Sequence, residues 1–454
     1  MNIATLCFAG SENTLGLSVL CDAIREEWPE ANIQRASFNA AKEADYLLVS
    51  LYWWRDVFAF VRFLSDAGID PRKRKPVIIL GGMSGVNPRP LTGYFHVAVL
   101  GDGEAAIVPI LKALEEKEDP YGLPGVWDPT RPVMPAFAPL IPAKQYVDLR
   151  TNKTTRIEIA RGCRSRCQFC QLAYMKPYRE QCHDVVRKLI LTSPTKTIAL
   201  FAPDRSSHSE IVKIDETLRK AGKANTGSDT RLEFLRKLKV ADKVRFGIEG
   251  FSEKTRKKLK KIPTNKMLIE DFEYIAKDLR TTKGKPITSC TAYLIADLMG
   301  EGEEEIFEFW GAMQEIDKRL QQKFTLFLSV SSFAPSPFTP LETASIHPYM
   351  EFGKLFEKTR PRFEHIVIAK RGGLIAAPQR LAQMLTIRGD EKARLVVYWL
   401  ATKAFGLLKS TDPSDGSTIL QACKQAGMRP EFLFEDISGE TLPWAHVKNP
   451  LDPN

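Results

Sequence analysis

Cysteine is scarce in this sequence, and it has no hydrophobic run of membrane-spanning length. Only eight of the 454 residues are cysteine. The most apolar stretch, residues 393–408, contains Arg394 and Lys403 and is too short to cross a bilayer, which is typical of a core helix. The first ten residues lack the basic segment and cleavage site of a signal peptide. We therefore expect a cytoplasmic protein with no membrane partner. In that reducing compartment, clustered cysteines indicate a metal site or catalysis rather than disulfides.

The net charge of +10 is unevenly distributed. Lys and Arg outnumber Asp and Glu by 35 to 25 in residues 151–345, but residues 1–150 have 15 against 18. The densest basic run is 254–261, KTRKKLKK, on an expected helix. It is interpreted either as a solvated helix or as a face that binds an anionic polymer such as nucleic acid. On the second interpretation, phosphates contact Lys254, Arg256, Lys257, Lys258, Lys260 and Lys261.

The order of apolar runs and glycine turns predicts an α/β protein of several domains. Residues 1–118 alternate short β-branched runs at 2–9, 46–52, 77–82 and 97–100 with helical patterns, which is typical of a doubly wound, Rossmann-like parallel sheet. Residues 119–150 are rich in proline and are expected to form an extended linker. Strand patterns then recur at 156–161, 197–202, 224–228, 243–248, 287–296 and 324–332. Residues 151–345 are thus expected to form a partial (β/α)6 barrel, and residues 346–454 a mainly helical domain.

Three cysteines, Cys163, Cys167 and Cys170, follow the first of these barrel strands within the stretch RGCRSRCQFC. Chemistry in such barrels lies on loops at the carboxyl ends of the strands. A structural zinc site needs four ligands, usually in two pairs, and this spacing does not supply them, although Cys182 could be a fourth. An iron–sulfur cluster of four irons usually takes four cysteines, so three leave one iron open to a substrate or cofactor.

The spacing Cys163-x3-Cys167-x2-Cys170, with Phe169 before the last cysteine, resembles the signature of the radical S-adenosylmethionine (radical SAM) superfamily. In that family the three cysteines bind a [4Fe–4S] cluster, and the open iron chelates adenosylmethionine. An electron from an external donor of the flavodoxin or ferredoxin type then gives a 5′-deoxyadenosyl radical, which abstracts a hydrogen from the substrate. The turns GGMSGVNPRPL and GDGE resemble the cobalamin-binding-type domain that precedes many such barrels, most of them in uncharacterised members.

The resemblance assigns cofactor contacts to residues at the ends of the barrel strands. Asp204 could accept from the adenosylmethionine ammonium, Asp229 and Arg231 follow the third strand, and Glu249 could accept from ribose hydroxyls. The fork of an arginine suits the carboxylate. Each has a structural alternative: Asp204 or Asp229 could cap the next helix, and Glu249 could pair with Arg245 or Lys254. The contact set also includes Phe169, and Ser329 and Ser331 on the sixth strand, where small side chains leave room for adenine.

Cobalamin is the doubtful cofactor. Cobalamin domains of mutases carry a histidine that ligates cobalt, but residues 1–95 contain no histidine at all. Some radical SAM methylases bind cobalamin without one, so the resemblance leaves this cofactor open.

Three functions are therefore compatible with the sequence. The first is a radical SAM enzyme acting on a large anionic substrate, for instance by rearranging or otherwise modifying a nucleobase in DNA or RNA. The second is a cobalamin-dependent radical SAM methyltransferase of a small molecule or peptide. The third is a non-enzymatic iron–sulfur electron carrier. The expected barrel argues against it, because an electron carrier does not need a cleft that could hold a cofactor. The oligomeric state does not follow from the sequence.

Overall fold

The structure is a computed structural model of the 454-residue chain. It describes residues 1–8, 15–82, 86–138, 146–147, 153–226, 230–237, 240–261, 263–298, 300–320, 322–346, 351–368, 377–410, 412 and 414–448. Asp229 and the expected strand positions 227–228 lie outside these ranges.

The N-terminal domain is a five-stranded parallel sheet with the order β2-β1-β3-β4-β5. Its strands are β1 (Asn2–Cys7), β2 (Asn32–Arg35), β3 (Tyr46–Ser50), β4 (Val77–Gly81) and β5 (Val97–Ala98). One face packs on α1 (Leu15–Glu27) and α4 (Gly103–Glu115), and the other on α2 (Phe38–Glu43) and α3 (Trp54–Ala67). The doubly wound sheet expected from the sequence is confirmed. The short strand β2 was missed because its residues are mostly exposed and polar.

The proline-rich segment after α4 lies along the edge of this sheet. Leu100 N–H donates to Gly125 O at 2.7 Å, and Asp102 N–H donates to Ala136 O at 2.7 Å. Trp127 is buried against the same edge. Residues 123–136 therefore satisfy backbone groups of the sheet edge through hydrogen bonds outside any regular strand.

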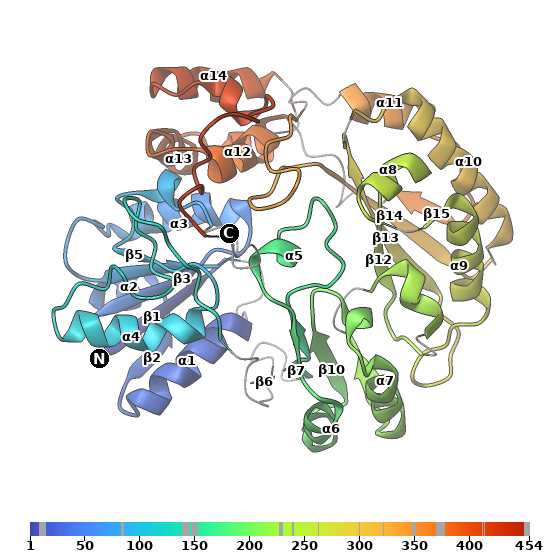
Figure 1. Ribbon diagram of the computed structural model, residues 1–454, viewed down its shortest axis with the longest axis horizontal. Helices are drawn as coiled ribbons and strands as arrows, with labels where there is room; N and C mark the ends of the chain where they lie inside the picture. Colours follow the sequence, from blue (N-terminus) through green and yellow to red (C-terminus); the bar gives the residue numbers. More distant parts are fainter. Residues whose placement is uncertain are drawn as a thin grey trace.

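The second half of the chain forms an open barrel of parallel strands (Figure 1). Six strands match the expected positions: β7 (Thr154–Glu158), β10 (Thr197–Phe201), β11 (Ala224–Asn225), β12 (Arg245–Glu249), β13 (Ser289–Ala296) and β14 (Thr325–Ser332). They form two sheets, β11-β10-β7 and β12-β13-β14, and among the described residues a bridge between Thr230 and Phe246 connects them. The partial (β/α)6 barrel is confirmed.

Helices cover the outside of the barrel. They are α6 (His183–Thr192), α7 (Ile211–Lys220), α8 (Glu253–Lys258), α9 (Asn265–Lys277) and α10 (Glu303–Arg319), with a 3-10 segment at Leu232–Lys237. Along β13 and β14 one face is fully buried under these helices, while the alternate residues are half-buried or exposed. The core therefore lies between strands and helices, and the inner face of the barrel stays accessible.

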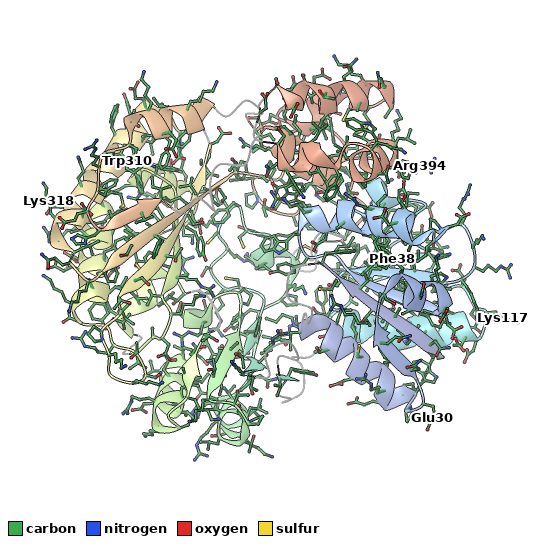
Figure 2. The ribbon with its side chains drawn as sticks, turned by 180° about the vertical axis from the view of Figure 1, so that it is seen from behind. Glu30, Phe38, Lys117, Trp310, Lys318 and Arg394 are labelled. Carbon is green, nitrogen blue, oxygen red and sulfur yellow. The ribbon has the colours of Figure 1, made fainter. Side chains whose placement is uncertain are left out.

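Several elements extend the barrel beyond its six strands. β6 (Tyr146–Val147) pairs antiparallel with β7, and β15 (Ile366–Ile368) pairs parallel with β14. Helix α11 (Glu351–Thr359) packs on α10, where the rings of Phe356 and Trp310 lie 4.6 Å apart; Trp310 is labelled in Figure 2. Residues 351–368 therefore pack with the barrel, although they follow the expected boundary at 345.

The remaining helices, α12 (Ala377–Arg388), α13 (Ala393–Thr402) and α14 (Asp415–Gln425), make the C-terminal region mainly helical, as expected. They lie over the sheet domain, where α12 and α13 pack against α3 (Figure 1). Arg394 of α13 is labelled at this junction in Figure 2. Within the described residues, no helix is long and apolar enough to span a membrane.

Candidate active site

A β-hairpin presents the three cysteines at the carboxyl end of β7. Its strands, β8 (Ala160–Arg161) and β9 (Arg179–Glu180), pair antiparallel and enclose the cysteine loop and the short helix α5 (Leu172–Met175). Gly162 opens the loop with φ of 76°, and a Cβ there would lie 2.6 Å from the carbonyl oxygens of Lys176 and Pro177. Only glycine fits this position, because the chain must turn left-handed while it crosses its own returning strand.

The three thiols lie close enough to affect one another. Cys167 is buried, Cys163 and Cys170 are half-buried, and none forms a disulfide. Burial raises the pKa of the Cys170 thiol to about 12, to which the neighbouring Cys167 and Cys163 also contribute. Burial likewise raises the pKa of Cys163. Thiols in such surroundings lose their protons when they bind a metal, so the loop favours metal ligation over free thiolates.

N–H groups are directed at the cysteine sulfurs. Nη1 of Arg231 lies 3.2 Å from Cys167 Sγ, and Ser165 N–H donates to Cys163 Sγ at 3.5 Å. Arg231 itself is buried, and its backbone N–H donates to Ser206 Oγ at 3.2 Å. Such N–H···S contacts stabilise the thiolates of an iron–sulfur cluster and tune its potential.

Glu249 pairs with Lys261 inside the site, rather than with Arg245 or Lys254 as the structural alternative supposed. The Lys261 ammonium lies 3.3 Å from Glu249 Oε1 and 5.9 Å from the centre of the Phe169 ring. Burial lowers the pKa of Lys261, but the charges of Glu249 and Cys167 outweigh burial and the pKa is raised. A Cβ on Gly247 would lie 1.8 Å from Glu249 Oε1, so the glycine makes room for this carboxylate.

The other expected contact residues are placed differently. Asp204 is buried and caps a 3-10 turn: its Oδ1 accepts from Ser206 N–H at 3.1 Å, and its Oδ2 accepts from the Ser207 hydroxyl. The contacts of Asp204 therefore agree with the structural alternative, in which this residue caps the next helical turn. Ser329 and Ser331 lie on the accessible inner face of β14, where Ser331 Oγ donates to Leu294 O at 3.3 Å.

The basic run does not form the expected face of six cations. Arg256 is fully buried, where its guanidinium donates to the carbonyl oxygens of Pro263, Gly250 and Phe251. Lys261 is 8% exposed and belongs to the site. The sequence expectation is therefore wrong for these two residues. The exposed cations of the run are Lys254, Lys257, Lys258 and Lys260.

Sequence reasoning missed Asp102, which connects the sheet domain to the cysteine hairpin. Its side chain has no exposed surface, and its carboxylate lies 3.0 Å from Arg161 Nη1, 2.9 Å from Lys176 Nζ and 2.9 Å from Arg179 Nη1. Burial opposes ionisation, but Lys176 and Arg161 outweigh it and lower the pKa of Asp102 to about 2. From the sequence, the GDGE turn is used only for its resemblance to a cobalamin-binding-type domain. The signal available was an acidic residue in the turn after the apolar run 97–100.

The chemistry of this donor set fits a [4Fe–4S] cluster, which is held by thiolates. In the described part of the chain, no three His, Cys, Asp or Glu side chains converge on one metal ion. A cuboidal cluster binds each cysteine through a different iron, and three free thiols with N–H donors suit it.

Comparisons with known proteins agree with this site. The profile of the Radical SAM superfamily matches residues 157–284, and that of the N-terminal region of radical SAM proteins matches residues 23–122. The chain belongs to the radical SAM superfamily, whose members are enzymes that use a [4Fe–4S] cluster and adenosylmethionine.

Individual relatives are distant. An uncharacterized protein of Methanocaldococcus jannaschii, MJ0966, is 22% identical over 377 residues, which cover 78% of this chain and 80% of the relative. The cobalamin-dependent S-adenosylmethionine radical enzyme OxsB with aqua-cobalamin bound is similar in fold, with a TM-score of 0.52 and 13% identity. That match covers 95% of this chain and 80% of OxsB. The OxsB structure that also contains S-adenosylmethionine has a TM-score of 0.51 and 13% identity, over 94% of this chain and 76% of OxsB. The likeness extends over both domains and concerns the fold alone.

Proposed function

We propose that this chain cleaves adenosylmethionine at the mouth of the barrel and directs the resulting radical at a substrate on the barrel's inner face. The observation that carries the proposal is the gathering of three free thiols, Arg231 and the Lys261–Glu249 pair at the carboxyl ends of the strands. When bound through Cys163, Cys167 and Cys170, the cluster supplies the electron that breaks the sulfonium bond.

The surrounding residues hold the cofactor in this proposal. Arg231 stands beside Cys167, where its guanidinium suits the adenosylmethionine carboxylate. Glu249 accepts from ribose hydroxyls, and its Oε1 also lies 3.3 Å from the Lys261 ammonium. Ser329 and Ser331 leave the inner face of β14 open for adenine. Asp204 is less suited to the ammonium, because both of its oxygens already accept hydrogen bonds from serines.

Two substrate classes have support. A nucleobase in DNA or RNA, rearranged or otherwise modified, is supported by the four exposed lysines of the basic run and by the charge of the barrel segment. Cobalamin-dependent methylation of a small molecule or peptide is supported by the fold likeness to OxsB. The missing histidine in residues 1–95 weakens the second class, and we expect little retention of hydroxocobalamin.

The test is anaerobic reconstitution with iron and sulfide, followed by mass spectrometry of products. Dithionite and adenosylmethionine are supplied to every sample, and duplex DNA, RNA and hydroxocobalamin are each added or withheld. We expect 5′-deoxyadenosine in every sample. A mass change in a nucleic acid supports the first substrate class. Stoichiometric cobalamin that survives desalting, visible in the absorbance spectrum, supports the second. Absence of 5′-deoxyadenosine from protein that carries about four irons would reject the function itself.

A further inference from the structure

Asp204 begins a series of hydrogen bonds that reaches the cysteine loop. Its Oδ1 accepts from the Ser206 hydroxyl at 2.5 Å and from the Ser206 backbone N–H at 3.1 Å. The oxygen of the same hydroxyl accepts from the backbone N–H of Arg231 at 3.2 Å. Nη1 of Arg231 in turn lies 3.2 Å from Cys167 Sγ. The series therefore connects the carboxylate that follows β10 to the buried thiol of the loop.

The residues of this series are shielded from water. Asp204, Ser206 and Arg231 are each at most 7% exposed, and Cys167 is also buried. The Ser206 hydroxyl serves both of its neighbours, because it has one proton to donate to a carboxylate and a lone pair to accept from an N–H group. In such a poorly hydrated place, water does not readily replace a lost hydrogen-bond partner. Ser206 therefore controls where the backbone of Arg231 lies.

The second oxygen of Asp204 leads to the first cysteine of the loop. Oδ2 accepts from the Ser207 hydroxyl, and the Ser207 carbonyl accepts from the Tyr178 hydroxyl at 3.3 Å. The ring of Tyr178 carries the guanidinium of Arg164, whose central carbon lies 4.2 Å from the ring centre. Arg164 directly follows Cys163 in the chain. The turn that Asp204 caps is therefore connected to both sides of the cysteine loop.

We propose that Asp204 is a positioning residue for the cluster and not a contact of the adenosylmethionine ammonium. It holds Arg231 against Cys167 through Ser206, and it thereby raises the reduction potential of the cluster. The inference rests on the proposed function, because it concerns the cluster that the three cysteines bind there. Reduction adds a negative charge, which a cation or an N–H donor beside a cysteine sulfur stabilises.

The geometry favours this role over a direct contact with the cofactor. An acid that binds an ammonium needs an oxygen directed at the ligand. Both oxygens of Asp204 instead accept from groups of the turn that it caps, and the side chain is buried there. The sequence stretch FAPDRSSH therefore supplies the acid together with the serines that direct it inwards.

The test uses substitutions that leave the formal charge unchanged. The test variant is Ser206→Ala, which removes the hydroxyl between Asp204 and Arg231. The control is Ser193→Ala, at the opposite end of β10. Ser193 is also buried, and its hydroxyl donates to Thr155 Oγ1 at 2.9 Å. Both variants thus remove one buried, hydrogen-bonded hydroxyl, but only one of the two hydroxyls belongs to the series.

The measurement is the midpoint potential of the loaded cluster, obtained by anaerobic redox titration without adenosylmethionine and followed by absorbance and electron paramagnetic resonance. We expect Ser206→Ala to lower the ratio of reduced to oxidised cluster at the wild-type midpoint by about threefold or more, which is about 28 mV for a one-electron couple. Ser193→Ala should match wild type. A merely structural role predicts that both variants lose thermal stability and keep the wild-type potential.

Two further variants show through which residue Ser206 acts. Arg231→Gln should lower the potential by at least as much, and adding Ser206→Ala to it should cause no further shift, because the two changes remove the same contact. Asp204→Asn keeps an oxygen that accepts from Ser206, so it should bind adenosylmethionine with wild-type affinity. A loss of that affinity by about tenfold or more would indicate a direct contact with the ammonium and overturn the proposal.

The proposal would also be overturned if Ser206→Ala kept the wild-type potential, or if its effect added fully to that of Arg231→Gln. Where Ser206→Ala assembles no cluster, a wild-type potential in Arg231→Gln would overturn it equally. A wild-type protein that carries about four irons and titrates normally, but forms no 5′-deoxyadenosine, would instead reject the proposed function and leave the positioning role standing.

Discussion

The carboxylate of Asp102 and the ammonium of Lys176 lie 2.9 Å apart, where the sheet domain meets the cysteine hairpin. The two residues are far apart in sequence, one after β5 and the other after α5. Because the Asp102 side chain is fully buried and also contacts Arg161 and Arg179, the ion pairs place the cysteine loop relative to the sheet domain. The first prediction concerns this junction.

The free energy of unfolding should decrease as the pH is lowered from about 4 to about 2. The folded-state pKa of Asp102 is lowered to about 2 from its ordinary 3.8, so its contribution is present above about pH 4 and is lost as the pH falls through 2. The shift corresponds to about 2 kcal/mol. Asp102→Asn should remove this contribution at neutral pH and lower the thermal unfolding midpoint. Asp70→Asn is the control: Asp70 also has a pKa of about 2, but it pairs with Arg72 at the surface, where such pairs contribute little. Equal effects of the two substitutions would contradict a buried junction.

The cysteines should be individually essential for cluster chemistry. Cys163→Ala, Cys167→Ala or Cys170→Ala should abolish 5′-deoxyadenosine formation and lower bound iron, because each thiolate is expected to bind a different iron. Cys182→Ser is the matched control, since Cys182 is exposed and precedes α6 outside the loop. Iron and sulfide analysis with product mass spectrometry measures both effects. Full turnover by Cys163→Ala would reject the assignment, and cluster loss in Cys182→Ser would revive a four-cysteine site.

The Lys261–Glu249 pair should be strongly coupled. Glu249→Gln leaves the Lys261 ammonium buried without its acidic partner, and Lys261→Met leaves the Glu249 carboxylate buried without its basic partner. Each substitution should lower the free energy of unfolding by about 3 kcal/mol. The double variant should be less destabilised than the sum of the two single effects, because it removes both charges. Thermal unfolding of the four proteins measures this coupling energy. Strict additivity would show that the two side chains do not interact. Adenosylmethionine affinity, measured on the same proteins, tests the proposed ribose contact separately.

Gly162→Ala should prevent cluster assembly. The added Cβ would lie 2.6 Å from the carbonyl oxygens of Lys176 and Pro177. Because this distance is too short, the hairpin could not keep its present backbone path. Gly222→Ala is matched in backbone conformation, with φ of 62° against 76°, but has no atom within 4 Å of the new Cβ. It should therefore cost only the left-handed strain, about 1 to 2 kcal/mol, and leave iron content unchanged. Equal iron content in the two variants would show that the crossing at Gly162 does not shape the cysteine loop.

Patterns that depend on neighbours in sequence predicted the parallel sheet, the six barrel strands and the cysteine spacing. Side-chain environment was harder to predict, because it depends on contacts from distant segments. Arg256 and Lys261 lie in the same basic stretch of sequence as their exposed neighbours. In the structure, however, Arg256 donates to loop carbonyls and Lys261 pairs with Glu249. Asp102 acts through three cations supplied by residues 161–179. The strand β15 is only three residues long and is recognisable by its pairing with β14 rather than by its own pattern.

The packing of α3 has a consequence for the order in which the molecule is completed. α3 is buried on the side of the sheet and also on the side of α12 and α13, through residues such as Phe58 and Phe60. The residues that cover its outer side, 377–402, leave the ribosome after the whole barrel has been made. A nascent N-terminal domain thus exposes an apolar helix during most of synthesis, because domains fold largely in the order of their synthesis. When α12 and α13 finally pack on α3, they connect the C-terminal region to the N-terminal domain after the barrel has been synthesised.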